Sequence, residues 1–243
     1  MACESAELTT DFDAREWDRV YSDPASPAIN FIFRRSAETA LELCRPLIRP
    51  GDPWLDAGCG TGRLAIALEQ MGARLFAADH DHRMLVFARE HSAQLSTSLL
   101  VARAEKLPFA DASLQGVVAT SLAGCLPSLT EFLAEICRVL RPEGHAVITF
   151  TNRTSLLLRL NHVVTSPQSK SERYQLYSAP VVVRELKRIG FRIEQVKFYN
   201  FVLHAGRRLL PPASIARRTD TLCGNRVGQW LGRNFAVVAR RAR

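Results

Sequence analysis

The sequence predicts an α/β fold in which helices cover both faces of a mostly parallel sheet. Apolar runs of strand length alternate with helix-like segments along the 243 residues, and the first strand-like run leads through a glycine-rich turn into a helix. Such alternation is typical of parallel sheets built from strand–helix–strand units. The chain is 47% hydrophobic, enough for a large core, and its length suits a single domain over residues 1–243.

The individual elements are expected from local patterns. Ser178 is a suitable helix cap, Pro180 is tolerated in the first turn that follows, and Gly190 is placed to end that helix. Strands are expected near residues 53–57, 74–78, 97–102, 114–120, 145–150, 191–199 and 234–239. Helices are expected near residues 61–70, 82–95, 128–139 and 181–189, with a further amphipathic segment at 154–164.

The most informative motif is Asp56-Ala-Gly-Cys-Gly-Thr-Gly62, which joins the first strand to the first helix of the sheet. Three glycines in five residues let backbone N–H groups approach a ligand at a helix N-terminus, where a Cβ would block them. The spacing is G-x-G-x-G, not the G-x-G-x-x-G of dinucleotide sites, and G-x-x-x-x-G-K-[ST] is absent. A carboxylate at Asp56 suits an ammonium group better than a pyrophosphate, so a neutral or cationic ligand is expected there.

With three further segments, this motif resembles the class I S-adenosylmethionine-dependent methyltransferases, specifically the methyltransferase type 11 group that includes the ubiquinone and menaquinone methylases. The segments are Arg74–Asp79, Ala104–Asp111 and Glu135–Gly144, and the resemblance covers roughly residues 50 to 150. It implies a Rossmann-like, seven-stranded sheet with one antiparallel strand inserted beside the sixth. It also implies S-adenosyl-L-methionine as methyl donor and S-adenosyl-L-homocysteine as product.

The resemblance further implies the residues that hold this cofactor. Asp56 and the glycine-loop backbone would bind the methionine portion, Asp79 the ribose diol, and Ala104 with Glu105 the adenine edge. Residues at the end of the fourth strand would face the methyl group. The full expected set is Asp56, Ala57, Gly58, Cys59, Gly60, Gly62, Asp79, His80, Ala104, Glu105, Thr120 and Ser121.

Three positions depart from the family pattern. Arg103 stands where an acid usually precedes the adenine loop. Leu114-Gln115 replaces a Phe-Asp pair, and Ala123-Gly124 replaces a frequent Glu-His pair. These departures leave the cofactor prediction intact but weaken any prediction of the acceptor.

Two segments outside the shared sheet are expected to build the acceptor pocket. Residues 1–45 are predicted to form a helical lid over the cofactor or, alternatively, a helix packed on the sheet. Residues 151–177 follow the fifth strand, at the edge where open α/β sheets place ligands, and are predicted to cover the substrate. Methyl transfer requires an aligned acceptor, and a base only when the acceptor must lose a proton. The candidate catalytic residues are His162, Tyr174 and Tyr177, with His204 also considered.

Charge is distributed unevenly along the chain, whose net charge is +8. From Arg184 onward there are 14 Lys/Arg and 3 Asp/Glu, whereas the first 183 residues hold 18 and 21. This basic C-terminal quarter favours contact with an anionic lipid or membrane surface, and nucleic acid is the less favoured partner. The alternative is a solvated surface on which arginine stems cover apolar neighbours.

Other signals narrow the function class. The six cysteines lack C-x-x-C spacing and the histidines lack H-E-x-x-H spacing, so neither a metal site nor a disulfide framework is predicted. Residues 1–13 are polar and acidic and carry no signal-peptide pattern, so a cytoplasmic location is expected.

The sequence therefore predicts methyl transfer from S-adenosylmethionine to a small, partly apolar acceptor at oxygen, carbon or nitrogen. Two alternatives stay open: an RNA or other nucleic-acid methyltransferase or binder that uses the basic C-terminal quarter, and a non-catalytic, methyltransferase-like interaction module. The acceptor's identity and the oligomeric state are not predicted.

Overall fold

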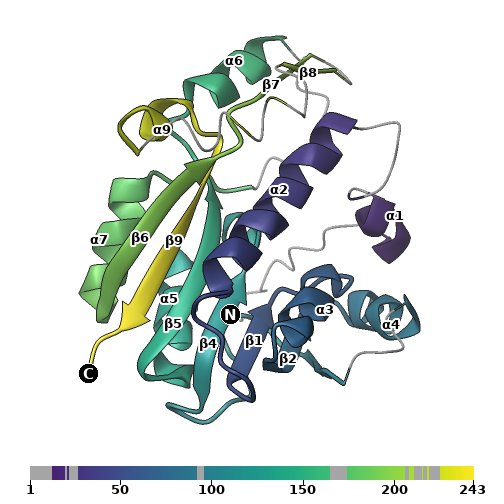
Figure 1. Cartoon of the computed structure of the whole chain (residues 1–243), viewed down its shortest axis with the longest axis vertical. Coiled ribbons are helices and arrows are strands. Elements are labelled where there is room, and N and C mark those ends of the chain that lie inside the picture. The colour runs from purple at the N-terminus through teal and green to yellow at the C-terminus, as the bar shows by residue number, and fades with distance from the viewer. Residues whose placement is uncertain are drawn as a thin grey trace, which may run out of the picture.

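The fold is a seven-stranded sheet with helices on both faces and a small two-stranded hairpin at one end (Figure 1). The predicted fold class is therefore confirmed. The computed structural model describes residues 13–19, 21, 27–91, 96–164, 174–205, 208–210, 215, 218 and 225–243. The strands are β1 (Pro53–Ala57), β2 (Arg74–Asp79), β3 (Ser98–Val101), β4 (Leu114–Ala119), β5 (Leu140–Thr151), β6 (Phe191–Tyr199), β7 (Leu203–Ala205), β8 (Arg208–Leu210) and β9 (Asn234–Arg241).

The strand order of the large sheet is β3-β2-β1-β4-β5-β9-β6. The pairs from β3 to β5 are parallel, and β9 is antiparallel to both β5 and β6. The last strand thus inserts between the fifth and the sixth, as predicted. The helices are α1 (Ala14–Arg19), α2 (Pro27–Cys44), α3 (Arg63–Gln70), α4 (His82–His91), the 3₁₀ turn η1 (Ala123–Cys125), α5 (Leu129–Val139), α6 (Leu156–Val164), α7 (Ala179–Ile189) and α9 (Asn225–Leu231).

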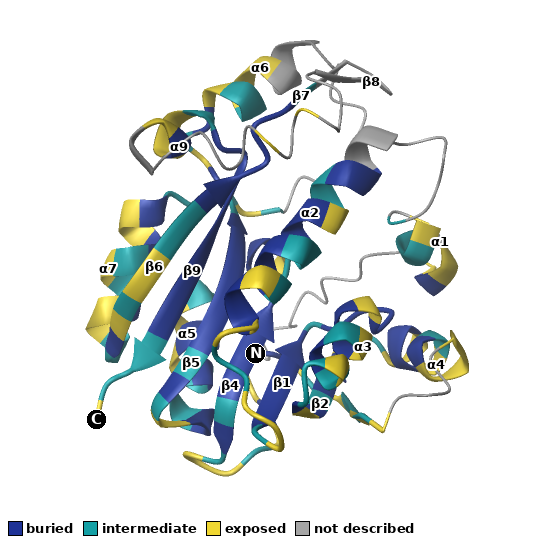
Figure 2. Cartoon of the chain, in the orientation of Figure 1, coloured by how far each residue is buried: buried dark blue, intermediate teal, exposed yellow. Residues whose placement is uncertain are grey.

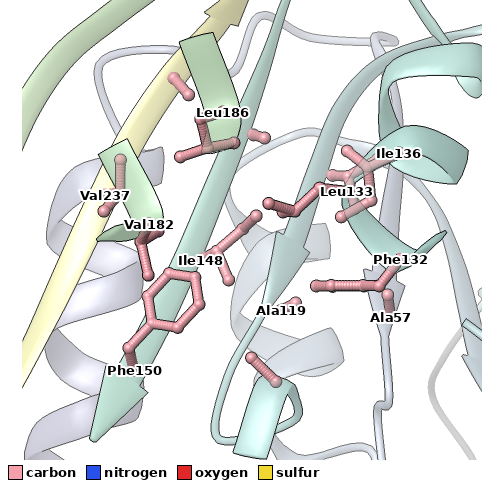
Figure 3. Close-up of a cluster of buried hydrophobic side chains, with 14 of the residues drawn as sticks. Ala57, Ala119, Phe132, Leu133, Ile136, Ile148, Phe150, Val182, Leu186 and Val237 are labelled. Carbon is pink, nitrogen blue, oxygen red and sulfur yellow. The ribbon is translucent and has the colours of Figure 1, made fainter. Parts of the chain in front are cut away.

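The helices form one layer on each face of the sheet, and the central strands between them are buried (Figure 2). Because side chains alternate along a strand, Trp54 of β1 packs with α2 and α3 while its neighbour Leu55 packs on the opposite side. The side chains of α5 and α7 meet those of the strands on that opposite side, as Figure 3 shows. The labelled residues of that cluster are Ala57, Ala119, Phe132, Leu133, Ile136, Ile148, Phe150, Val182, Leu186 and Val237.

Several boundaries differ from those expected. Gly62 has a left-handed backbone (φ 77°), so α3 begins at Arg63 and not at residue 61. The described part of α4 ends at His91, because residues 92–95 lie outside the described ranges. Strand β5 begins at Leu140 and not near residue 145, and a bulge with Glu143 at φ 65° shifts its register against β4. The amphipathic segment 154–164 forms a helix only from Leu156.

The segment before β6 follows the predicted signals. In α7, Ser178 occupies the cap position without a side-chain cap bond, proline lies in the first turn, and Gly190 (φ 111°) ends the helix. The helix α9 and the β7–β8 hairpin were not predicted. Their sequences are short and lack a clear period, which explains the omission.

The N-terminal region divides into two helices with different surroundings. In α2, Ala40, Leu43 and Cys44 are buried in the same cluster as Trp54, so this helix packs on the sheet. The preceding helix α1 lies against the glycine loop instead. Residues 1–12 lie outside the described ranges.

Replacing Gly116 of β4 with alanine is expected to destabilise the fold. A Cβ there would lie 2.2 Å from Cε2 of the buried Trp54 indole, so the core would have to shift. Overpacking of this kind costs about 1–3 kcal/mol of unfolding free energy, measurable by urea denaturation. The smaller ring in Trp54→Phe should recover part of that loss in the double variant, and strictly additive effects would contradict the proposed contact.

Candidate functional site

The predicted cofactor residues come together at the carboxyl edge of the parallel strands. Asp56 and Ala57 end β1, Asp79 ends β2, and Ala104 follows β3. The glycine loop leaves β1 at the same edge, and Thr120 with Ser121 leaves β4 beside it. Because β1 pairs with both β2 and β4, a ligand at this edge can meet all of these segments.

At three positions of the glycine loop, the backbone has a conformation that only glycine adopts without strain. Gly58, Gly60 and Gly62 have φ values of 70°, 52° and 77°. A Cβ on Gly58 would lie 2.7 Å from the side chain of Leu122, which closes the loop from the β4 side. The N–H groups of Gly58 and Cys59 donate to the Ala78 carbonyl at 2.8 and 3.0 Å. The loop is therefore fixed to the end of β2.

Asp56 is a buried carboxylate, 1% exposed, and neither of its oxygens has a hydrogen-bond partner among the described residues. Burial, and secondarily the nearby Asp79 carboxylate, raises the pKa of Asp56 to about 7. A buried charge without a partner is costly unless a ligand supplies the opposite charge. The orphaned carboxylate thus fits a cationic group, such as the ammonium of a bound amino acid.

Asp79 is held by the glycine loop and by its own following turn. Its Oδ2 accepts from the Gly60 N–H at 2.9 Å, and its Oδ1 accepts from the Asp81 N–H at 3.0 Å. The neighbouring His80 ring is largely exposed, with Nδ1 3.3 Å from Oδ1 of Asp79, a contact that raises the pKa of His80. A carboxylate oxygen can accept more than one hydrogen bond, so Asp79 retains capacity for a diol.

The predicted adenine segment is partly buried, and its acid, Glu105, lies two residues after the position at which the family usually has one. Ala104 is buried, and Glu105 is largely covered. Nη2 of Arg103 lies 3.5 Å from Oε1 of Glu105, so the arginine at the unusual position partners the acid that follows it. Glu105 is therefore the carboxylate available to that edge of the site.

Helix α1 is attached to the glycine loop by an ion pair that was not singled out from the sequence. Asp18 accepts from Nε and Nη2 of Arg63 at 2.6 and 2.7 Å, and from the Thr61 hydroxyl at 3.3 Å. Arg63 lowers the pKa of Asp18. The indole nitrogen of Trp17 lies 3.1 Å from where a Cβ on Gly60 would be. One aromatic and one acidic residue of α1 thus cover the loop.

Tyr21 continues this cover next to Asp56. Its side chain is half-buried, and desolvation, with the Asp56 carboxylate as the next largest cause, raises the pKa of Tyr21 to about 12. The guanidinium of Arg63 lies 5.3 Å from the Tyr21 ring centroid, and Phe33 of α2 meets the same ring edge-on. Trp17, Tyr21 and Phe33 therefore gather beside the glycine loop.

The two candidate catalytic tyrosines are placed against η1. A Cβ on Gly124 would lie 2.3 Å from the Tyr174 ring, so the glycine provides the space that this ring occupies. The Tyr174 oxygen accepts from the Thr151 hydroxyl at 3.2 Å, and the Tyr177 hydroxyl donates to Gln175 Oε1 at 2.8 Å. At Gly124, one of the two positions where the family often has a Glu-His pair, any larger residue would clash with the Tyr174 ring.

Burial determines what these tyrosines can do chemically. It raises the pKa of Tyr174 to about 12 and raises that of Tyr177 as well, so both phenols are neutral near pH 7. They can donate and accept hydrogen bonds but are poor bases in this state. The other candidates, His162 in α6 and His204 in β7, have side chains outside the described residues.

Hydrogen-bonded polar residues lie at the ends of β4, β5 and β6, and most of them were not predicted from the sequence. The Ser121 N–H donates to the Thr149 hydroxyl at 2.9 Å, and the Tyr199 hydroxyl donates to Ser36 of α2 at 3.2 Å. Asn200, buried with φ 60°, follows β6 at the same edge. Single amides and hydroxyls scattered over 160 residues give no sequence pattern by which to find them.

The described residues form neither a membrane-spanning helix nor a metal-binding cluster. None of their helices is both long and apolar enough to cross a bilayer. They also contain no group of three or more His, Cys, Asp or Glu side chains placed to hold a metal ion.

Comparison with known proteins finds methyltransferases that resemble this chain in sequence. Residues 55–148 match the family model described as a methyltransferase domain. The uncharacterized methyltransferase YodH of Bacillus subtilis is 32% identical over 52% of the chain and 50% of its own length. An O-methyltransferase of Pyrenophora dematioidea is 26% identical over 90% of the chain and 80% of its length.

A solved structure shares the fold at low sequence identity. It is the 1,6-didemethyltoxoflavin-N1-methyltransferase of Burkholderia thailandensis, with bound 1,6-didemethyltoxoflavin and S-adenosylhomocysteine. It superposes with a TM-score of 0.63 at 16% identity, over 95% of the chain and 84% of that structure. The chain spans about half the length of curated relatives such as YodH.

Asp56→Asn is expected to stabilise the ligand-free protein, increasingly as pH rises. The pKa of about 7 exceeds the unfolded value of about 4, so wild-type stability is lost as pH rises through that window. Above pH 7 the variant should be about 2–4 kcal/mol more stable. Thermal unfolding at pH 5 and pH 8 measures this, and an equal difference at both values would contradict an ionised, unpartnered Asp56.

Proposed function

We propose that the chain is a class I S-adenosylmethionine-dependent methyltransferase and that it transfers a methyl group from S-adenosylmethionine to a small, partly apolar acceptor. The observation that carries the proposal is the orphaned Asp56 carboxylate beside the glycine loop. The family match and the sheet order support the same cofactor. The acceptor atom, oxygen, carbon or nitrogen, is left open because the relatives include both an O- and an N-methyltransferase.

The residues present suit the parts of this cofactor. Asp56 would pair with the methionine ammonium, for which the buried carboxylate supplies the missing charge. Asp79 would accept from the ribose hydroxyls, and Ala104 with Glu105 would meet the adenine edge. When bound, the sulfonium supplies an electrophilic methyl carbon.

The contribution of the chain is positioning. Ser121, at φ 56°, is fixed by the hydroxyl of Thr149 at the end of β4, where it would face the methyl group together with Thr120. Tyr174 and Tyr177, as neutral phenols, would orient an acceptor through hydrogen bonds. In-line displacement gains most from such alignment and from exclusion of water. An acceptor that need not lose a proton is therefore favoured.

The nucleic-acid alternative is less favoured because part of the basic C-terminal quarter is paired within the protein. Arg240 binds Glu143 at 2.6 Å and Glu194 at 2.9 Å, and Arg188 binds Glu185 at 2.7 Å. These pairs reduce the charge free to meet phosphates. RNA binding that depends steeply on salt would reopen this alternative.

Calorimetric titration with S-adenosylmethionine tests the cofactor site. Asp56→Asn and Asp79→Asn should each weaken binding by more than about tenfold, because each removes a charge-assisted contact worth about 1.5–3 kcal/mol. Asp111→Asn, at an exposed carboxylate 79% accessible, is the matched control and should bind as wild type. Wild-type affinity for S-adenosylmethionine in all three variants would refute the assignment of Asp56 and Asp79 to the cofactor site.

A radiolabelled-methyl transfer screen over quinones, phenols, lipids and RNA then tests the reaction itself. Label in a small organic acceptor supports the proposal, and label in RNA supports the nucleic-acid alternative. Tight cofactor binding without transfer to any class would favour a non-catalytic interaction module.

We also propose that α1 acts as a lid over the cofactor. Asp18→Asn removes the ion pair with Arg63 and should weaken S-adenosylmethionine binding about two- to fivefold, with faster dissociation in stopped-flow measurements. Glu185→Gln breaks a comparable carboxylate–arginine pair on α7 and serves as control. Unchanged dissociation in Asp18→Asn would leave α1 without this role.

A further inference from the structure

We propose that the surface formed by α6 and α9 binds an anionic phospholipid membrane. Four large apolar side chains are exposed there, and we call them the α6–α9 face: Leu156 (45% exposed), Leu160 (51%), Val227 (48%) and Trp230 (54%). Exposed apolar residues are ordinary when isolated, but a cluster on neighbouring elements marks an interaction site. The inference goes beyond the proposed function, since binding to a surface requires no methyl transfer.

The two helices form one continuous surface because side chains tie them together. The Ser155 hydroxyl donates to the Leu231 carbonyl at 3.1 Å, and the Thr154 hydroxyl donates to the Gln229 carbonyl at 2.9 Å. Leu156 follows Ser155 in the chain, and Trp230 lies between Gln229 and Leu231, so the start of α6 is joined to the end of α9. Figures 1 and 2 show α6 and α9 side by side at one end of the sheet, with exposed positions on both.

The charged side chains that the structure describes beside the α6–α9 face are basic. Arg153 and Arg159 are exposed beside the two leucines. Neither residues 151–164 nor residues 225–243 contain an Asp or Glu. On α7, by contrast, Arg188 is neutralised by Glu185. Apolar side chains flanked by two exposed arginines fit a surface that is both apolar and anionic, and each basic residue near such a membrane contributes attraction.

This combination favours a lipid surface over a second copy of the chain. A symmetric dimer through the α6–α9 face would bring the same arginines together across the interface, which costs free energy. Tryptophan is enriched where proteins meet the headgroup region. The helix α6 has nine residues, so it would lie on the membrane and not cross it.

Vesicle sedimentation tests the proposal with the full chain. Vesicles of phosphatidylcholine containing phosphatidylserine should bind the wild-type protein, more weakly at higher salt, and pure phosphatidylcholine vesicles should bind much less. Leu160→Asp/Arg159→Glu should lower the partition coefficient at least about fivefold. The matched control Val86→Asp/Arg89→Glu places the same changes on exposed positions of α4 and should bind as wild type.

Folding and self-association are checked in parallel. Thermal unfolding and S-adenosylmethionine titration verify that the variants are folded, and Trp230→Ser replaces the α6 pair if that pair unfolds. No binding by the wild type, equal binding to neutral vesicles, or equal loss in the α4 control would overturn the proposal. So would light scattering that shows a dimer which the α6 pair dissociates, because the face would then bind a second copy.

Discussion

The position of β1 between β2 and β4 is the constraint on which the site depends. The chain leaves β1 toward one side, builds β2 and β3, and then returns past β1 to build β4 on the other side. Loops at such a reversal diverge at the carboxyl edge and leave room for a ligand. The glycine loop, Asp79 and Ser121 come from three strands but border that one space.

The same burial that prepares the site weakens the protein around it. Asp56 lies in a dry position near a second carboxylate, which raises its pKa and makes its ionised form costly. A bound cation stabilises the ionised carboxylate. Because Asp56 is already desolvated in the folded protein, cation binding does not have to remove water from it, and the ligand binds more tightly. Helix α1 extends this arrangement, because Trp17 and Asp18 cover the loop without neutralising Asp56. The ligand-free protein is therefore less stable because of Asp56, a residue whose charge is positioned for ligand binding.

Features set by neighbouring residues could be predicted from the sequence, and those set by distant contacts could not. The glycine loop, the acid at Asp79 and the seven strands follow from local spacing and hydrophobic alternation. The Asp18–Arg63 pair joins residues 45 apart, and the fit of Tyr174 over Gly124 joins residues 50 apart. Neither leaves a local pattern. Asn200 has a positive φ in the turn that follows the edge strand β6. The residue type alone does not predict that conformation or that position.

The insertion of β9 between β5 and β6 affects how the chain can assemble during synthesis. When β6 leaves the ribosome, its neighbour in the finished sheet has not yet been made, and 34 residues, 200–233, separate the two strands. At ordinary elongation rates this delay lasts roughly 2–7 s. During this delay, the backbone edges of β5 and β6 that later pair with β9 have no partner. The nascent chain would therefore expose strand edges that chaperones recognise, and only the emergence of β9 closes the sheet.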